Sequence, residues 1–134
     1  MVKKRRHILR IHAIDHVVLT VEDLTRTCNF YARVLGMEVI RFEGDRTALK
    51  FGSSKINLHK AGNEFEPKAV RPTRGSADIC LVTSKPLSQW QRPLKKCGVE
   101  VIEGPVLQNG ARGAMQSIYL RDPDGNLIEI SRYE

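Results

Sequence analysis

The sequence has little of what marks secreted or membrane-spanning proteins. Its 134 residues include three cysteines, Cys28, Cys80 and Cys97, which form no CxxC pair. No apolar run approaches the roughly 20 residues that cross a bilayer, and no cleavage site follows the basic N-terminus. We therefore expect a cytoplasmic protein with reduced thiols, no secretory signal and no membrane partner.

Acidic residues are absent from the first ten positions, which hold five of the 22 positive charges. The whole chain has a net charge of +7, but residues 11–134, with 17 positive and 15 negative charges, carry only +2. The basic excess is thus mainly a solvated tail, residues 1–10. The rest has one tryptophan and no alternation of basic and aromatic residues, so we expect no nucleic-acid partner.

The chain repeats itself. The sequence Gly-Met-Glu-Val-Ile at 36–40 returns as Gly-Val-Glu-Val-Ile at 98–102, an offset of 62 that also places His16 on Asp78. Repeats of this kind indicate one structural unit used twice. We expect a single domain, residues 11–134, with module one at about 12–60, a linker at 61–76 and module two at about 77–133.

Each module is predicted to fold as strand, helix and three strands. In the first, hydrophobic periodicity predicts strands at 13–21, 37–42, 47–51 and 55–60 and a helix at 24–35 that Gly36 ends. In the second, it predicts strands at 77–83, 99–103, 116–120 and 126–131, a helix at 86–97 disturbed by Pro93, and a glycine-rich loop at 104–113 that acts as a lid. Cys80 is expected in the core.

Neither module is large enough to bury a good core alone. We therefore predict an α+β fold in which two tandem βαβββ modules curve their sheets around a shared cavity. Within strands, side chains alternate between two faces. The repeat then brings together His16 and Asp78 from the first strands and Asn57 and Glu129 from the last strands, with His59 near Asn57.

An imidazole and two carboxylates are suitable ligands for a divalent cation. The spacing alone leaves two interpretations open. The residues form a metal site, or they are half-exposed strand residues whose partners are other side chains of the protein.

Several motifs resemble the vicinal oxygen chelate superfamily, which includes glyoxalase I, fosfomycin-resistance proteins, extradiol dioxygenases and bleomycin-binding proteins. The resemblance covers residues 12–133 and rests on the segments 14–19, 30–31, 34–37 and 122–130. Within the superfamily, the segments 55–59, 64–69, 75–80 and 117–119 are similar to the glyoxalase domain-containing protein 5 type, which includes virulence-associated glyoxalase-like proteins.

The resemblance implies a divalent metal ion (Ni, Zn, Mn or Fe) held by His16, Asp78 and Glu129, with Asn57 and His59 as possible further pocket residues. Asn57 stands where glyoxalase I has a glutamate. The implied activity is that of a lyase or isomerase on a small oxygen-chelating substrate, with Glu129 as the catalytic base. A homodimer is also implied.

Two other functions stay open. One is a non-catalytic small-molecule binding or resistance protein of the bleomycin-binding type, which needs an apolar cavity and no metal. The other is an extradiol-type dioxygenase, whose iron needs two histidines and one carboxylate. In this sequence those ligands are His16, His59 and Glu129.

Overall fold

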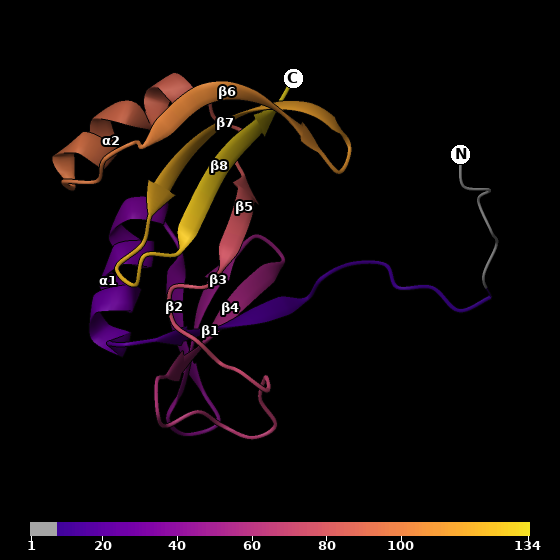
Figure 1. Cartoon of the computed structure of the whole chain (residues 1–134), viewed down its shortest axis with the longest axis vertical. Helices are drawn as coiled ribbons and strands as arrows, with labels where there is room; N and C mark the ends of the chain where they lie inside the picture. Colours follow the sequence, from indigo (N-terminus) through magenta and orange to yellow (C-terminus); the bar gives the residue numbers. More distant parts are fainter. Residues whose placement is uncertain (1–7) are drawn as a thin grey trace.

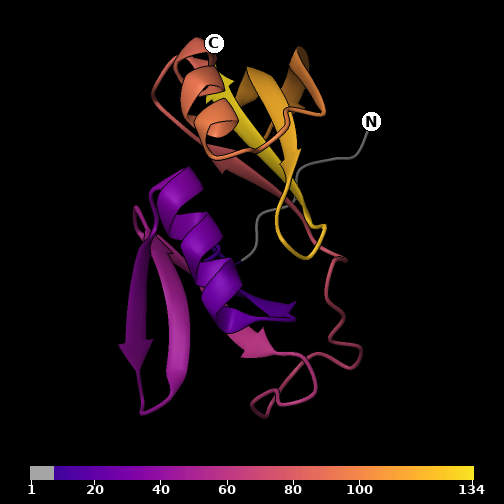
Figure 2. The same ribbon diagram turned by 90° about the vertical axis from the view of Figure 1, so that its left-hand side faces the viewer.

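The computed structural model describes residues 8–134, so most of the tail predicted for residues 1–10 lies outside the described residues. Two four-stranded sheets face each other across α1 (Figures 1 and 2). The first sheet has the order β1-β4-β3-β2 and the second β5-β8-β7-β6, with the parallel pairs β1/β4 and β5/β8. The predicted α+β fold of two βαβββ modules is confirmed.

The first module contains β1 (His16–Val21), α1 (Leu24–Leu35), β2 (Glu38–Phe42), β3 (Arg46–Phe51) and β4 (Ser54–Lys60). The second contains β5 (Asp78–Val82), the short 3-10 turn η1 (Leu87–Gln89), α2 (Gln91–Lys96), β6 (Glu103–Gly110), β7 (Gly113–Arg121) and β8 (Leu127–Tyr133). Between residues 8 and 134, no helix is long and apolar enough to cross a membrane.

The helix α1 begins and ends where its sequence predicts. The Asp23 carboxylate caps the first turn by accepting a hydrogen bond of 2.9 Å from the Arg26 amide. Gly36 ends the helix in the left-handed conformation, at φ 71°. One face, which includes Cys28 and Tyr31, is buried in the hydrophobic core.

The second module departs from its predicted elements at three places, of which the first two are its helix and the strand predicted after it. The helix predicted at 86–97 is divided into η1 and α2, so that Pro93 falls in the first turn of α2. A first-turn proline loses no helical hydrogen bond, because the amides there have no partner within the helix. The strand predicted at 99–103 is also wrong, since β6 begins only at Glu103.

The glycine-rich segment 104–113 is a strand and a tight turn rather than the predicted lid loop. It forms β6 and pairs with β7 through a hairpin in which Gly110 and Gly113 are partners. The register is irregular between Glu103 and Val106, where Gly104 has φ 107°. A Cβ at Gly104 would overlap the Ser117 carbonyl oxygen, so glycine here permits close strand packing.

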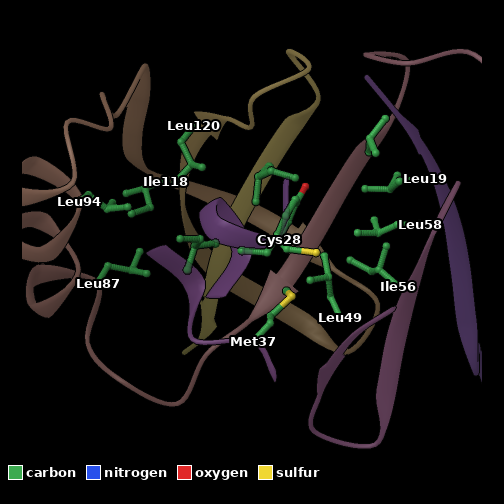
Figure 3. Packing of buried hydrophobic residues seen from close by; sticks show 14 residues of the cluster. Leu19, Cys28, Met37, Leu49, Ile56, Leu58, Leu87, Leu94, Ile118 and Leu120 are labelled. Atoms are coloured by element: carbon green, nitrogen blue, oxygen red, sulfur yellow. The ribbon is translucent and has the colours of Figure 1, made fainter. Parts of the chain in front are cut away.

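One hydrophobic core serves both modules (Figure 3). It joins side chains of the first sheet, the helices α1 and α2 and the second sheet, among them Leu19, Leu49, Ile56, Leu94, Ile118 and Ile128. The predicted inability of either module to bury its own core agrees with this packing. Each sheet thus turns one face toward the helices, and we call the opposite one its helix-free face.

A buried polar junction joins α1 to the second module. The Tyr31 hydroxyl donates to Oδ2 of Asp122 at 2.6 Å, while Oδ1 of Asp122 accepts from the amides of Asp124 and Asn126. The Asn126 side chain in turn accepts from the amide of Ala77 at 2.9 Å. Burial, followed by the neighbouring Asp122 carboxylate, raises the pKa of Tyr31. The turn at 122–126 therefore joins α1 of the first module to the second module through hydrogen bonds.

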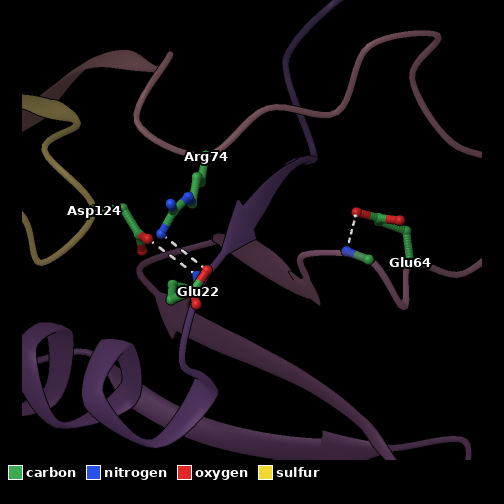
Figure 4. A network of polar contacts seen from close by, with 5 residues as sticks. Glu22, Glu64, Arg74 and Asp124 are labelled. Carbon is green, nitrogen blue, oxygen red and sulfur yellow. Dashed lines mark hydrogen bonds and ion pairs between the residues drawn. The ribbon is translucent and has the colours of Figure 1, made fainter.

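A second junction, at the surface, ties the connector between the modules to both of them (Figure 4). Arg74 forms an ion pair of 2.9 Å with Glu22, whose amide donates to Oδ1 of Asp124 at 3.0 Å. The neighbouring Gly75 has φ 75°, and a Cβ there would lie 2.6 Å from the Asp124 carbonyl oxygen. Glycine is required at this close approach of connector and turn.

Candidate functional site

The candidate residues occupy equivalent places on the two helix-free faces. On the first sheet, His16 lies two residues before Val18, whose partner across β1/β4 is Asn57. On the second, Asp78 lies two residues before Cys80, whose partner across β5/β8 is Glu129. The strand pairing therefore reproduces the equivalence of His16 with Asp78, and of Asn57 with Glu129, that the repeat predicts.

A single chain does not bring these residues together. His16 and Asn57 belong to one sheet, and Asp78 and Glu129 belong to the other. Across residues 8–134 there is no group of three or more His, Cys, Asp or Glu side chains that could hold a metal ion. We call the candidate residues of each sheet a candidate half-site: His16 and Asn57 on the first sheet, and Asp78 and Glu129 on the second.

Asp15 orients the imidazole of His16. The Nδ1 atom of His16 lies 2.8 Å from Oδ1 of Asp15, and this hydrogen bond is the main reason that the pKa of Asp15 is lowered. A carboxylate that accepts the Nδ1 proton leaves Nε2 as the free acceptor of a neutral imidazole. Sequence reasoning missed this role of Asp15, although an acidic residue directly before the candidate ligand was the available signal.

Glu129 lies in a network of hydroxyl groups on the second sheet. The Ser131 hydroxyl donates to Oε2 of Glu129 at 3.2 Å and lies 2.6 Å from the Ser117 hydroxyl. Tyr119 lies opposite Glu129 on the neighbouring strand β7, and burial followed by the Glu129 charge raises the pKa of Tyr119. Gln108 donates to the Tyr119 hydroxyl at 2.9 Å. These contacts hold the carboxylate of Glu129 in a defined position.

Cys80 corrects one sequence expectation, because it lies outside the core. Its side chain is on the helix-free face beside Glu129, with Sγ 3.2 Å from the Ser131 hydroxyl. Partial burial raises the pKa of the thiol, and the carboxylates of Glu129 and Asp78 act in the same direction. The aliphatic neighbours Ile79 and Leu81 face the core instead, since side chains alternate along a strand.

His59 is only 7% exposed and lies under the connector. Its ring packs edge-on against Phe65, with 5.5 Å between centroids, and the Arg46 guanidinium lies 4.5 Å from the same Phe65 ring. Its partner on β1 is Thr20, four residues beyond His16, which is about 13 Å along a strand. His59 is therefore well separated from His16 on the same face.

Burial, and then the charge of Arg46, lowers the pKa of His59 below 6.5. The unfolded chain therefore binds this proton more readily than the folded chain, so the free energy of unfolding should fall as the pH drops through 6.5 and toward the folded pKa. His59→Gln should reduce this dependence in urea unfolding between pH 7.5 and 5. The matched control is His12→Gln at an exposed histidine; equal slopes in both variants would contradict the prediction.

The two helix-free faces carry opposite charge. On the face of His16 and Asn57, strand register places three basic residues, Arg46, Lys50 and Lys55, and one acidic residue, Glu38. On the corresponding face of the second sheet it places three acidic residues, Asp78, Glu103 and Glu129, and one basic residue, Arg121, so the two faces differ in the sign of their net charge.

A cavity of about 580 Å³ lies between β1 and the connector. Val18, Thr20 and His59 line its sheet side, and Lys68 and Arg71 line its connector side. Asp78 and Glu129 do not border it. His16 and Asn57 do not border it either, so the cavity is separate from these four residues and combines apolar walls with two cationic side chains.

The donor chemistry of the two half-sites together suits a divalent cation. An oriented neutral imidazole and two carboxylates are ligands that Zn, Mn, Fe and Ni accept. In addition, the amide oxygen Oδ1 of Asn57 is buried without a hydrogen-bond partner among the described residues. The residues fit such an ion only if the half-site of His16 meets a half-site of Asp78 and Glu129.

Several known proteins resemble this chain over most of its length. Residues 13–130 match the family model of the Glyoxalase/Bleomycin resistance protein/Dioxygenase superfamily. Virulence protein STM3117 of Salmonella typhimurium is 54% identical over 92% of this chain and 85% of its own. Glyoxalase domain-containing protein RDO1 of Mycosarcoma maydis is 48% identical over 98% and 74%. An integron cassette protein from the mobile metagenome of V. cholerae has a TM-score of 0.93 and 52% identity, covering 96% of this chain and all of its own.

More distant proteins share the fold. Metallothiol transferase FosB of Shouchella clausii is 26% identical over 90% of this chain and 80% of its own. Lactoylglutathione lyase from Agrobacterium tumefaciens has a TM-score of 0.70 at 22% identity, with coverage of 92% and 95%. The antibiotic-binding protein TnmS3 from Streptomyces has a TM-score of 0.69 at 20% identity, with coverage of 94% and 99%.

Proposed function

Because the chain belongs to the glyoxalase/bleomycin resistance protein/dioxygenase superfamily, we propose that it is a metal-dependent lyase or isomerase. Its substrate is a small molecule that presents two neighbouring oxygen atoms. The observation that carries this proposal is the equivalent placement of His16 and of Asp78 with Glu129 on the helix-free faces. The Asp15 hydrogen bond supports it, because such a bond prepares an imidazole for metal binding.

The working unit in this proposal is a homodimer. Each site takes His16 from one chain and Asp78 and Glu129 from the partner chain. The separation of these donors within one chain supports this arrangement. The opposite charges of the two helix-free faces support it as well, since complementary faces attract.

In the proposed reaction, each residue of the site has a separate role. Asp15 holds the His16 ring, while Ser131 holds the carboxylate of Glu129. Glu129 accepts a proton from the substrate and returns it to a neighbouring atom. A bound divalent ion supplies Lewis-acid stabilisation of the negative charge that develops on the substrate oxygens.

Metal analysis tests the proposal. We expect the purified protein to bind Ni, Zn, Mn or Fe, and His16→Ala or Glu129→Gln to weaken that binding by about 100-fold or more. Asp15→Asn should weaken it by about 10-fold, because it disturbs only the orientation of the ring. His12→Ala is the matched control. The proposal fails if the protein binds none of these ions at micromolar concentration, or if His16→Ala retains the metal.

The cavity of about 580 Å³ favours a second function, non-catalytic binding of a small molecule. It has apolar walls and does not border Asp78 or Glu129, so a ligand there needs no metal. Tight binding of a small aromatic compound that is unaffected by a chelator would favour this function. The dioxygenase alternative has less support, because His59 is buried beneath Phe65 and distant from His16.

We place this activity in the cytoplasm. The described cysteines Cys28, Cys80 and Cys97 are all free, as a reducing compartment requires. The partners in this proposal are the small-molecule substrate and a second copy of the chain, with neither nucleic acid nor membrane involved.

A further inference from the structure

The cavity beside β1 is closed on one side by the connector, residues 61–77. Figure 2 shows the connector leaving β4 and looping beside the first sheet before it enters β5. Its later part is folded by its own hydrogen bonds: the Thr73 hydroxyl donates to the Arg71 carbonyl oxygen at 3.1 Å, and the Ser76 hydroxyl donates to the Thr73 carbonyl oxygen at 2.7 Å. The ion pair of Arg74 with Glu22 ties it to the end of β1. This side of the cavity is therefore in place before any ligand binds.

On the sheet side, the cavity is bordered by two buried polar side chains that have no hydrogen-bond partner. Thr20 on β1 and His59 on β4 lie opposite each other across the strand pair and are 8% and 7% exposed. Within residues 8–134, neither the Thr20 hydroxyl nor a ring nitrogen of His59 makes a hydrogen bond. Buried polar groups nearly always have such a partner. The pair therefore indicates a ligand that supplies the missing contacts.

On the connector side, the cavity is positively charged. Lys68 and Arg71 border it, and no Asp or Glu does so among the described residues. The Lys68 ammonium lies 2.9 Å from Oε2 of Glu66, so its charge already has a partner. The Arg71 guanidinium has no ion pair or hydrogen bond within the described range 8–134. It thus offers a free positive charge whose geometry suits the two oxygen atoms of a carboxylate or phosphate.

Most of the remaining lining is apolar and suits a hydrocarbon group. It comprises Val17, Val18, Leu19, Pro67, Ala69, Pro72 and Ala77. The volume of about 580 Å³ lies within the range of pockets that hold small organic ligands, and it is much larger than a bare inorganic anion requires. The walls and the free guanidinium together indicate a ligand with an apolar body and one anionic end.

We propose that this cavity binds an organic anion whose carboxylate or phosphate contacts Arg71, Thr20 and His59. The hydrocarbon part of the ligand lies between Val18 and the connector. The guanidinium compensates the charge of the ligand, while the hydroxyl and the imidazole each donate one hydrogen bond. Burial keeps the pKa of His59 below its ordinary value, so the ring is neutral and donates from one nitrogen. None of the candidate metal ligands borders the cavity, so the inference does not require the metal site proposed above.

The first test is calorimetric titration of the full chain in the presence of EDTA. Octanoate should bind with a dissociation constant on the order of 100 µM. Octan-1-ol has the same chain without the charge and should bind at least about 10-fold more weakly. Acetate, which has the charge without the chain, should show no binding at about 1 mM. Octyl phosphate identifies the preferred anionic end, because it should bind more tightly than octanoate only if that end is a phosphate.

The second test assigns the anion to its contacts. Arg71→Gln and Thr20→Val should each weaken octanoate binding by about 10-fold and leave octan-1-ol binding unchanged, which also shows that the variants fold. Lys68→Gln should weaken it by less than about 3-fold, because Glu66 already compensates the Lys68 charge. The matched control is Arg92→Gln, at an exposed arginine of α2 that does not border the cavity.

The outcomes separate this inference from the proposed function. It is overturned if octanoate does not bind at about 1 mM, if octan-1-ol binds equally well, or if Arg71→Gln binds octanoate like Arg92→Gln. Octanoate binding that disappears with EDTA or in His16→Ala would place the anion at the metal instead, and would overturn it as well. If the protein binds octanoate but none of the metal ions, the proposed function fails and the anion site remains.

Discussion

Mixing His16→Ala chains with Glu129→Gln chains is expected to restore metal binding and activity that neither variant has alone. If each site takes His16 from one chain and Asp78 with Glu129 from the other, half of a mixed dimer is intact. One of its two sites carries both substitutions, and the other carries none. Random exchange makes half of all dimers mixed, so about a quarter of the sites should recover.

The measurement is metal content and turnover after the two variants are unfolded together and refolded. As a reference, His16→Ala chains are mixed with His12→Ala chains, which keep all the site residues, at the same total concentration. This mixture gives the metal content and turnover expected when only half of the chains carry His16. Two variants within one half-site, Asp78→Asn and Glu129→Gln, provide the matched negative control, because neither can complete the other. Recovery in that control, or none in the first mixture, is incompatible with a site shared between chains.

Asp122→Ala is expected to cost the largest share of stability, about 4 kcal/mol of the free energy of unfolding. The Asp122 carboxylate accepts from the Tyr31 hydroxyl, the Asn126 side chain and the amides of Asp124 and Asn126. Asp122, Asn126 and Tyr31 are buried. The hydrogen-bond donors that lose the Asp122 carboxylate would therefore have little access to water as a replacement acceptor. Denaturant unfolding followed by circular dichroism measures the effect.

Two further variants calibrate that result. Tyr31→Phe removes one of the four bonds and should lower the free energy of unfolding by about 2 kcal/mol. Asp45→Ala, at an exposed aspartate in another turn, should change it by less than about 0.5 kcal/mol. If Asp122→Ala resembles Asp45→Ala, the junction does not stabilise the fold as its contacts indicate.

The fold could be predicted because its signals are local and occur twice. Asp23 and Gly36 bound α1 through contacts within a few residues. The matching segments at 36–40 and 98–102 reveal the two modules without any knowledge of packing. Period-two alternation then places His16, Asp78 and Glu129 on particular faces, and the strand register agrees.

The missed features depend on contacts that no short window contains. The glycines near β6 suggest a loop, but Gly104 is needed because its backbone passes close to Ser117 on the next strand. Cys80 has the aliphatic neighbours of a core residue, and only the register with Glu129 shows that it faces outward. The Tyr31–Asp122 bond joins residues 91 positions apart, so neither residue signals the other.

For the candidate site, the sequence predicts equivalent strand positions but not whether the residues at those positions meet. Repeat symmetry relates His16 to Asp78 but does not state whether their sheets meet within one chain. The core supplies the missing information, because α1 and the sheets pack on their helix-facing sides. This packing leaves the two helix-free faces apart within one chain, which no local sequence pattern indicates.

The turn at 122–126 also affects how distant sequences should be judged. Its Asp-Pro-Asp-Gly-Asn segment is among the most recognisable in the chain, yet its contacts reach Tyr31 and Ala77 and secure the junction between the modules. Any descendant that needs this architecture must preserve the turn, whatever its ancestral chemistry has become. The presence of this segment in another sequence therefore indicates the fold, whereas the activity proposed above depends on other positions, His16, Asp78 and Glu129.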